Sequence, residues 1–218
     1  MRKPDPFQRY PNRYDAWFDG AGKEIFALEV DAFKLLLPEL PKPWFEIGIG
    51  SGRFAQALGI PWGIDPSKKL ADIARSRGVR VIEGVGENLP IPDNLLGTVF
   101  LIVTLCFVDD PRKVISEARR VLADDGFLVA GIVSADSAWG EFYKNEGRKG
   151  HPFYSHARFF VCRDLIGLLN EQGFHLVKKV STLFSPPGEK LSSGIEEGYH
   201  PDAGFVIMSA KLAKEEKC

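Results

Sequence analysis

The sequence predicts an α/β fold, a doubly wound and mostly parallel sheet with helices on both faces. The first observation is a strand-like segment at residues 44–46 that leads through a glycine loop into a helix-like segment at 53–58. The second is the alternation of short strand-like and helix-like segments that follows, which is typical of parallel sheets. The third is the unbroken apolar run at residues 98–105, as expected of a central strand buried on both faces.

The glycine loop follows the first strand directly. Glu46 ends that strand, and Gly48, Gly50 and Gly52 then occupy every second position. Glycine lets the backbone turn sharply and approach a ligand, because no Cβ stands in the way. A strand, such a loop and a helix N-terminus together favour a nucleotide pocket at the top of a parallel sheet. A tight strand-to-helix turn without a ligand is the alternative.

Arg53 distinguishes this loop from the dinucleotide-binding fingerprint. That fingerprint has the form G-x-G-x-x-G, and its third glycine is replaced here by Arg53. The pattern therefore favours an adenosine ligand other than NAD.

A carboxylate follows the second predicted strand. The short apolar run at residues 63–64 leads into Asp65, and a carboxylate at a strand end can accept both hydroxyl protons of a ribose. The pair Asp65-Pro66 also suits a helix start. The two roles are compatible.

The rest of the chain continues the alternation. After the third strand, the polar pair Glu87-Asn88 could hydrogen-bond an adenine edge, although the same pair is ordinary loop chemistry. The remaining elements are expected to be helices over 22–37, 68–77, 112–122 and 164–172, and strands over 79–82, 127–132, 174–184 and 204–211.

Four segments in this order resemble the class I S-adenosylmethionine-dependent methyltransferases, and among them the small-molecule subgroup called type 11. They are FEIGIGSGRFA, GIDPS, GENLPIPD and EARRVLADDGFLV. The resemblance is good over residues 44–132 and implies a Rossmann-like sheet of seven strands, with the last strand antiparallel. It also implies the in-line transfer of a methyl group from S-adenosylmethionine to a small-molecule acceptor, with no obligatory catalytic triad. An amine acceptor need only arrive deprotonated, whereas a hydroxyl or carbon acid would require a base.

The resemblance further implies a set of cofactor-binding residues. The glycine loop would wrap the methionine part, Asp65 would hold the ribose, and the end of the fourth strand would lie near the sulfonium. A Tyr-Asp-x-Trp-Phe stretch would close over the cofactor, unless its aromatic residues only pack a helix onto the sheet. The full set is Glu46, Gly48, Gly50, Gly52, Asp65, Glu87, Asn88, Leu89, Thr104, Leu105, Tyr14 and Trp17.

One domain is expected over residues 1–218. Its parts would be an N-terminal helical lid (1–40), a cofactor-binding half (41–133), a substrate and lid insertion (134–163), and a C-terminal helix with strands (164–218). His151 and His156 lie in the insertion, where a hydrogen-bonded structural histidine is a more common role than a base.

Composition limits the partners. The 28 basic and 29 acidic residues give a net charge of −1, so there is no basic field to attract nucleic acid. No apolar run is long enough to span a membrane, and no apolar signal region begins the chain. Cys106, Cys162 and Cys218 are widely spaced, which argues against a metal site and for a reducing, cytoplasmic location. A cofactor-binding regulatory protein without turnover and an NAD dehydrogenase remain as alternatives, the second weakened by Arg53.

Overall fold

The computed structural model describes residues 5–212, so residues 1–4 and 213–218, Cys218 included, lie outside the described part of the chain. The helices are α1 (Pro6–Arg9), α2 (Pro11–Trp17), α3 (Lys23–Lys34), α4 (Arg53–Leu58), α5 (Lys68–Ser76), α6 (Pro111–Val121), α7 (Ala138–Arg148) and α8 (Cys162–Glu171), with short 3-10 helices η1 (Leu37–Glu39) and η2 (Tyr154–His156). The strands are β1 (Trp44–Ile47), β2 (Trp62–Asp65), β3 (Arg80–Glu83), β4 (Leu96–Ile102), β5 (Leu122–Val133), β6 (Phe174–Thr182), β7 (Ile195–Glu197) and β8 (Phe205–Leu212).

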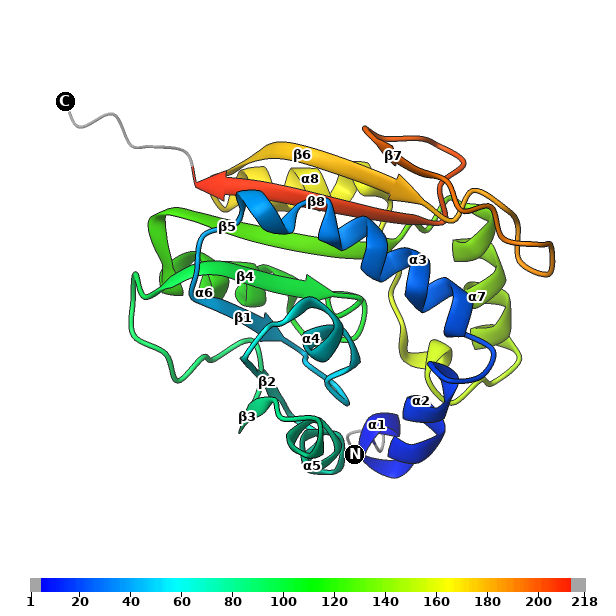
Figure 1. Ribbon diagram of the computed structural model, residues 1–218, viewed down its shortest axis with the longest axis horizontal. Coiled ribbons are helices and arrows are strands. Elements are labelled where there is room, and N and C mark those ends of the chain that lie inside the picture. The colour runs from blue at the N-terminus through cyan, green and yellow to red at the C-terminus, as the bar shows by residue number, and fades with distance from the viewer. Residues whose placement is uncertain (1–4, 213–218) are drawn as a thin grey trace.

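The strands form one sheet in the order β3-β2-β1-β4-β5-β8-β6-β7 (Figure 1). The first five in this order are parallel, and β8 runs antiparallel to both β5 and β6. The chain winds outward from β1 in one direction and from β4 in the other. Ligand crevices in such sheets open at this switch point, beyond the carboxyl ends of the strands.

The predicted doubly wound sheet is confirmed, but it has eight strands rather than seven. The additional strand is β7, which pairs with the end of β6 through Thr182 and Ile195. Its short sequence, Ile-Glu-Glu, lacks the run of alternating apolar residues by which a strand is recognised.

Two of the predicted strand boundaries were wrong. β4 ends at Ile102 rather than at residue 105, because Val103 has a φ of 52° and leaves the strand conformation. β5 begins at Leu122, directly after α6, and its pairing with β4 shifts register between Leu96 and Thr98. Residues 123–126, which were expected to form a loop, are the additional residues of β5 at this irregularity.

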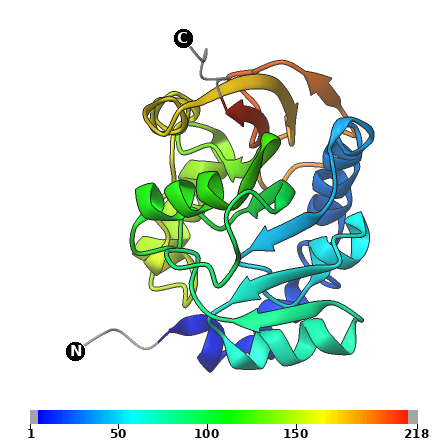
Figure 2. The same cartoon turned by 90° about the vertical axis from the view of Figure 1, so that its left-hand side faces the viewer.

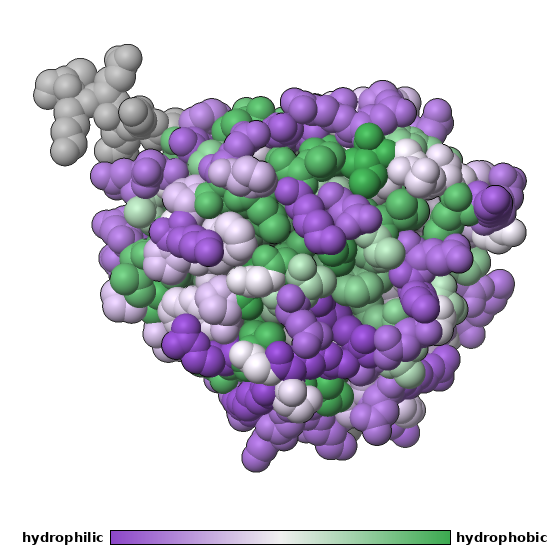
Figure 3. Space-filling model, in the orientation of Figure 1, coloured by the Kyte–Doolittle hydropathy of each residue, from purple (hydrophilic) through white to green (hydrophobic). Residues whose placement is uncertain are grey.

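Helices cover both faces of the sheet, with α3 and α4 on one side and α6 and α8 on the other (Figure 2). The alternation of side chains along β5 supplies both cores: Val129 and Val133 pack under α3 and α4, whereas Leu128 and Ala130 pack under α6 and α8. In the space-filling view, polar side chains cover the margins of the α3 face and apolar ones gather towards its centre (Figure 3).

Between residues 5 and 212 there is no helix with the length and hydrophobicity required to cross a membrane.

Candidate active site

A cavity of about 870 Å³ lies beyond the carboxyl ends of the parallel strands. The N-terminal helices α1 and α2 lie at this end of the sheet, as does α7 (Figure 1). Two groups among the residues that line the cavity come from different parts of the chain, and we name them for what they contribute. The loop side consists of Gly48, Gly50, Asp65 and Glu87, and the aromatic side consists of Glu29, Tyr143, Tyr154 and Phe159.

The glycine loop forms the floor of the loop side. Gly50 has a φ of 54° and donates its N–H to Asp65 Oδ2 at 2.8 Å. A Cβ at Gly50 would lie 3.2 Å from the hydroxyl of Tyr14, so the lid passes directly over the bare backbone. Gly52 begins α4 and does not line the cavity, because the position of its Cβ faces Ala74 of α5.

Asp65 holds the ends of β1 and β2 together. Its second oxygen, Oδ1, accepts the N–H of Ser67 at 2.8 Å, so Ser67 rather than Asp65 caps α5. The carboxyl lines the cavity although the residue is only 6% exposed. Burial raises the pKa of Asp65 to about 6, although the hydrogen bonds from Ser67 and Gly50 work in the opposite direction.

Glu46 lies behind the loop and does not line the cavity. It is 2% exposed, and its Oε2 has no hydrogen-bond partner within the described chain. Burial and then the charge of Asp65 raise the pKa of Glu46 well above its usual value. Burial and the charges of Asp65 and Glu46 likewise raise the pKa of Tyr14.

Thr104 lines the cavity beside the glycine loop. Its hydroxyl lies 3.0 Å from the carbonyl of Ile47, and this contact joins the ends of β4 and β1. Gly48 passes so close to Thr104 that a Cβ there would lie 2.5 Å from its Cγ2. The adjacent Leu105 is buried in the core under α6 and does not line the cavity.

The predicted adenine-binding segment is only partly at the cavity. Glu87 lines it, and its Oε1 accepts the N–H groups of Asp109 and Asp110 at 3.1 and 3.2 Å. Asn88 is exposed outside it. Leu89 is buried in the core, and its N–H donates to Glu117 Oε2 at 2.8 Å.

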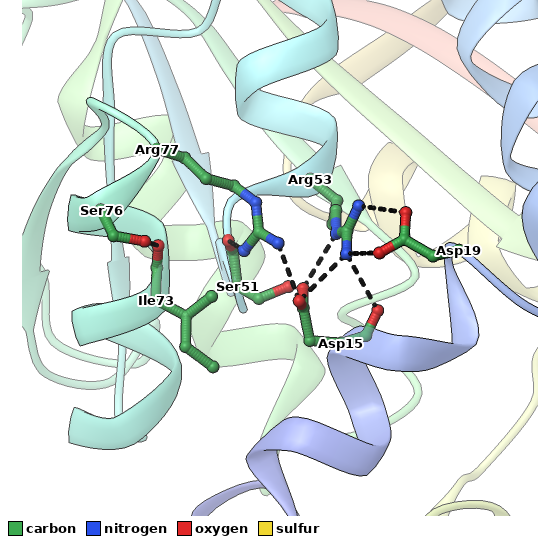
Figure 4. Close-up of polar contacts among 7 residues, drawn as sticks. All are labelled: Asp15, Asp19, Ser51, Arg53, Ile73, Ser76 and Arg77. Carbon is green, nitrogen blue, oxygen red and sulfur yellow. Dashed lines mark hydrogen bonds and ion pairs between the residues drawn. The ribbon is translucent and has the colours of Figure 1, made fainter.

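Ion pairs join the N-terminal segment that carries α2, the predicted lid, to Arg53 at the start of α4 and to Arg77 at the end of α5 (Figure 4). Asp15 on α2 accepts hydrogen bonds from Arg53 at 2.9 Å and from Arg77 at 2.7 Å, and Arg53 also binds Asp19. Burial alone would raise the pKa of Asp15, but the bonds from Arg53 and Arg77 outweigh it and hold the pKa at about 2. Arg53, which replaces the third glycine of the dinucleotide fingerprint, thus anchors the lid. Both predicted lid residues, Tyr14 and Trp17, line the cavity.

Rings from the insertion form the aromatic side. The Tyr143 ring lies 4.5 Å from that of Tyr154 and 6.3 Å from that of Phe159, centroid to centroid. His151 stacks on Tyr154 at 4.2 Å, and its Nδ1 accepts the N–H of Tyr154 at 3.4 Å. Burial lowers the pKa of His151, which favours a neutral, structural imidazole. His156 also lines the cavity.

Glu29 was missed by the sequence analysis. It lies on α3, is 5% exposed and lines the aromatic side of the cavity. Burial raises its pKa to about 8. A signal was present in the sequence, because Glu29 follows Ile25 by four residues and precedes Phe33 by four, on the apolar face of a predicted helix.

Metal binding has no support in the described residues, where no group of three or more His, Cys, Asp or Glu side chains is arranged around a common point. Cys106 and Cys162 are buried free thiols.

Comparison with known proteins finds a matching family model and relatives that cover most of the chain. A family model described as a methyltransferase domain matches residues 45–130. An uncharacterized protein of Mycobacterium tuberculosis is 41% identical over 204 residues, which cover 90% of this chain and 70% of the relative. An uncharacterized protein of Methanocaldococcus jannaschii is 37% identical over 205 residues, with 94% and 98% covered.

A similar solved structure comes from Thermotoga maritima. It superimposes with a TM-score of 0.88 at 38% identity and covers 95% of this chain and 99% of its own. That protein is described as an S-adenosylmethionine-dependent methyltransferase and possible histamine N-methyltransferase.

Proposed function

The chain belongs to the class I S-adenosylmethionine-dependent methyltransferases of type 11, and we propose that it methylates a small-molecule acceptor. The observation that carries this proposal is the two-sided cavity under the lid. Its loop side has the features of an adenosine site, whereas its aromatic side adds the rings of Tyr143, Tyr154 and Phe159. A cavity of this size and lining suits a small acceptor better than a nucleic acid strand.

S-adenosylmethionine is the family's cofactor, and the loop side fits it. Each oxygen of Asp65 accepts one backbone N–H and keeps a lone pair for a ribose hydroxyl. The bare backbone of Gly50 gives room that a side chain would fill. We assign Asp65 to the ribose, the loop from Gly48 to Gly50 to the methionine part, and Glu87 to the adenine end.

The chain's own residues act mainly by holding the reactants and excluding water. When bound, the cofactor supplies a methyl group on a positively charged sulfur, which is already activated for displacement. Tyr14 covers the glycine loop, and Thr104 ties the ends of β4 and β1 together beside that loop. Positioning of this kind can supply about 7–11 kcal/mol of rate acceleration, which leaves no need for a catalytic triad.

Thermal unfolding with S-adenosylmethionine, S-adenosylhomocysteine and NAD tests the cofactor assignment. A ligand at a hundred times its Kd stabilises the protein by about 2.7 kcal/mol, which for a domain of this size raises Tm by roughly 5–10 °C. We expect both sulfur ligands to raise Tm and NAD to leave it unchanged. Stabilisation by NAD, or by none of the three, contradicts the proposal.

A turnover assay then tests methyl transfer itself. Release of S-adenosylhomocysteine is measured with a panel of small amines, phenols and carboxylic acids, and the methylated product is identified by mass spectrometry. Amines come first in the panel because the Thermotoga maritima protein is described as a possible histamine N-methyltransferase. Cofactor binding without turnover on any acceptor would favour a regulatory protein instead.

A further inference from the structure

Glu29 is a buried carboxyl without a partner. Its residue is 5% exposed, and in the described structure no hydrogen bond or ion pair reaches its oxygens. The neighbouring positions on the same face of α3, Ile25 and Phe33, are both part of the apolar core. Burying a polar group without a hydrogen bond is unfavourable, and most helices would place an apolar residue here. The carboxyl does, however, line the cavity, where a ligand could reach it.

Within residues 5–212, no Lys, Arg or His side chain forms an ion pair with Glu29, although His151 and His156 also line the cavity. Among the described residues that line the cavity, the guanidinium groups belong to Arg13 and Arg158, and both side chains are exposed at its rim. Arg158 is already bound to the carbonyls of Val108 and Asp109. A cation that pairs with Glu29 must therefore come from a ligand.

The electrostatic neighbours of Glu29 place it on the aromatic side. Its charge raises the pKa of Tyr143 and Tyr154, in each case after the larger effect of burial. The charge that raises the pKa of Glu46 is that of Asp65, on the loop side. The cavity thus holds two separate acidic centres, one at Asp65 and one at Glu29.

The rings around Glu29 favour the same kind of ligand. Tyr143, Tyr154 and Phe159 present aromatic surfaces to the cavity. The faces of such rings attract cations, most strongly where water is excluded. Glu29 is protonated at neutral pH in the absence of a cation and releases this proton when an ammonium group binds beside it. A carboxylate formed in this way beside several rings is the chemistry that recognises an ammonium group.

We propose that Glu29 binds an amino group of the methyl acceptor, so that the enzyme selects small amines over neutral alcohols and phenols of the same shape. This inference rests on the proposed methyltransferase function. Glu29 acts as a specificity-determining residue, and the surrounding rings complete the amine site. A hydrogen bond to a charged group that is lost on substitution costs roughly tenfold to a hundredfold in affinity.

The test compares matched ligands on the full chain saturated with S-adenosylhomocysteine. Titration calorimetry measures the Kd of 2-phenylethylamine and of 2-phenylethanol, which have similar shapes and differ in charge. The wild-type protein should bind the amine at least tenfold more tightly, and this arm needs no variant. Equal affinity for the two ligands, or preference for the alcohol, overturns the inference.

Glu29→Gln then tests the residue itself, with Glu24→Gln on the exposed side of α3 as the matched control. We expect Glu29→Gln to lose the preference for the amine and to raise KM for amine acceptors more than it lowers kcat. Its Kd for S-adenosylhomocysteine should stay unchanged, as should every property of Glu24→Gln. Retained amine preference in Glu29→Gln overturns the inference. So does weakened binding of S-adenosylhomocysteine, which would assign Glu29 to the cofactor.

The failure of this inference differs from a failure of the proposed function. If the wild-type protein binds S-adenosylhomocysteine but shows no preference for amines, only the role of Glu29 is wrong. If it binds neither sulfur ligand, the methyltransferase proposal is wrong.

Discussion

The two sides of the cavity are built by different means. The loop side depends on backbone groups, since Asp65 is held by the N–H groups of Gly50 and Ser67 and the loop needs glycine to pass under Tyr14. The aromatic side depends on side chains brought together from α3, α7 and η2. A backbone-built site must keep its sequence pattern, whereas a side-chain-built site can change its ligand through single substitutions. The comparison explains how one fold can keep a single cofactor while its acceptor varies.

The largest effect is expected from Gly50→Ala, compared with Gly59→Ala. Both glycines have a positive φ, 54° and 74°, so both variants strain the backbone by about 1–2 kcal/mol. A Cβ at Gly50 meets Tyr14 beside the cavity, but one at Gly59 has no atom within 4 Å. Calorimetry should show that only Gly50→Ala loses affinity for S-adenosylhomocysteine, by roughly a hundredfold or about 2.8 kcal/mol. Equal losses in both variants would mean that backbone strain, not ligand space, is responsible.

The next effect concerns Asp65→Asn, with the exposed Asp72→Asn on α5 as its control. Loss of a charged acceptor should weaken S-adenosylhomocysteine binding by about 1.5–3 kcal/mol. Because the pKa of Asp65 is about 6, wild-type affinity should also fall as pH drops through that value, while Asp65→Asn shows no such step. Binding isotherms across this pH range check both points. A wild-type affinity that is independent of pH would contradict the assignment of Asp65 to the ribose.

On the aromatic side, Glu29 makes stability depend on pH. Its folded pKa of about 8 lies above its unfolded value of 4.5, so the folded state holds the proton more tightly, and the associated stability is lost as pH rises through 8. Between pH 6 and pH 7 the free energy of unfolding of wild type should fall by about 1.4 kcal/mol relative to Glu29→Gln. Urea titrations at both pH values measure the difference. If the free energy of unfolding changes by the same amount in both proteins between pH 6 and pH 7, Glu29 is already ionised in the folded state.

The smallest effect is expected at the lid, which covers both sides. Asp15→Asn should lower the free energy of unfolding by about 1 kcal/mol, since it leaves Arg53 and Arg77 without their shared carboxylate. The depressed pKa of Asp15, about 2, means that its contribution is present above pH 3.8 and is lost as pH falls towards 2. High salt should reduce the difference between Asp15→Asn and wild type, and the exposed Asp31→Asn should have no effect. A difference that salt leaves unchanged would argue against an ion-pair origin.

The loop side could be predicted from the sequence to a large extent, because its residues lie within short motifs. Gly48, Gly50 and Asp65 line the cavity as their spacing indicated. The errors arose where a neighbour in sequence faces the other way in space: Leu89 and Leu105 belong to the core under α6, and Asn88 is exposed. Strand and turn geometry decide such orientations, and a one-residue shift reverses them.

The aromatic side could not be assembled from the sequence in the same way. Glu29 and Tyr143 are more than a hundred positions apart, and only the packing of α3 and α7 against the same end of the sheet brings them to one cavity. The insertion was predicted to form part of the substrate site, but nothing in its pattern specified which of its rings line the cavity. The strand β7 was missed for a related reason, since its three residues gain their conformation from pairing with β6.

Arg53 links the cofactor loop to the lid, because one guanidinium binds both Asp15 and Asp19. Across homologous chains, these three positions should therefore coevolve. A lineage that replaces Arg53 by a small residue loses the reason to keep the two acids, and its N-terminal segment becomes free to diverge. The relatives should then fall into two groups, one that keeps Arg53 with both Asp15 and Asp19 and one that keeps none of the three.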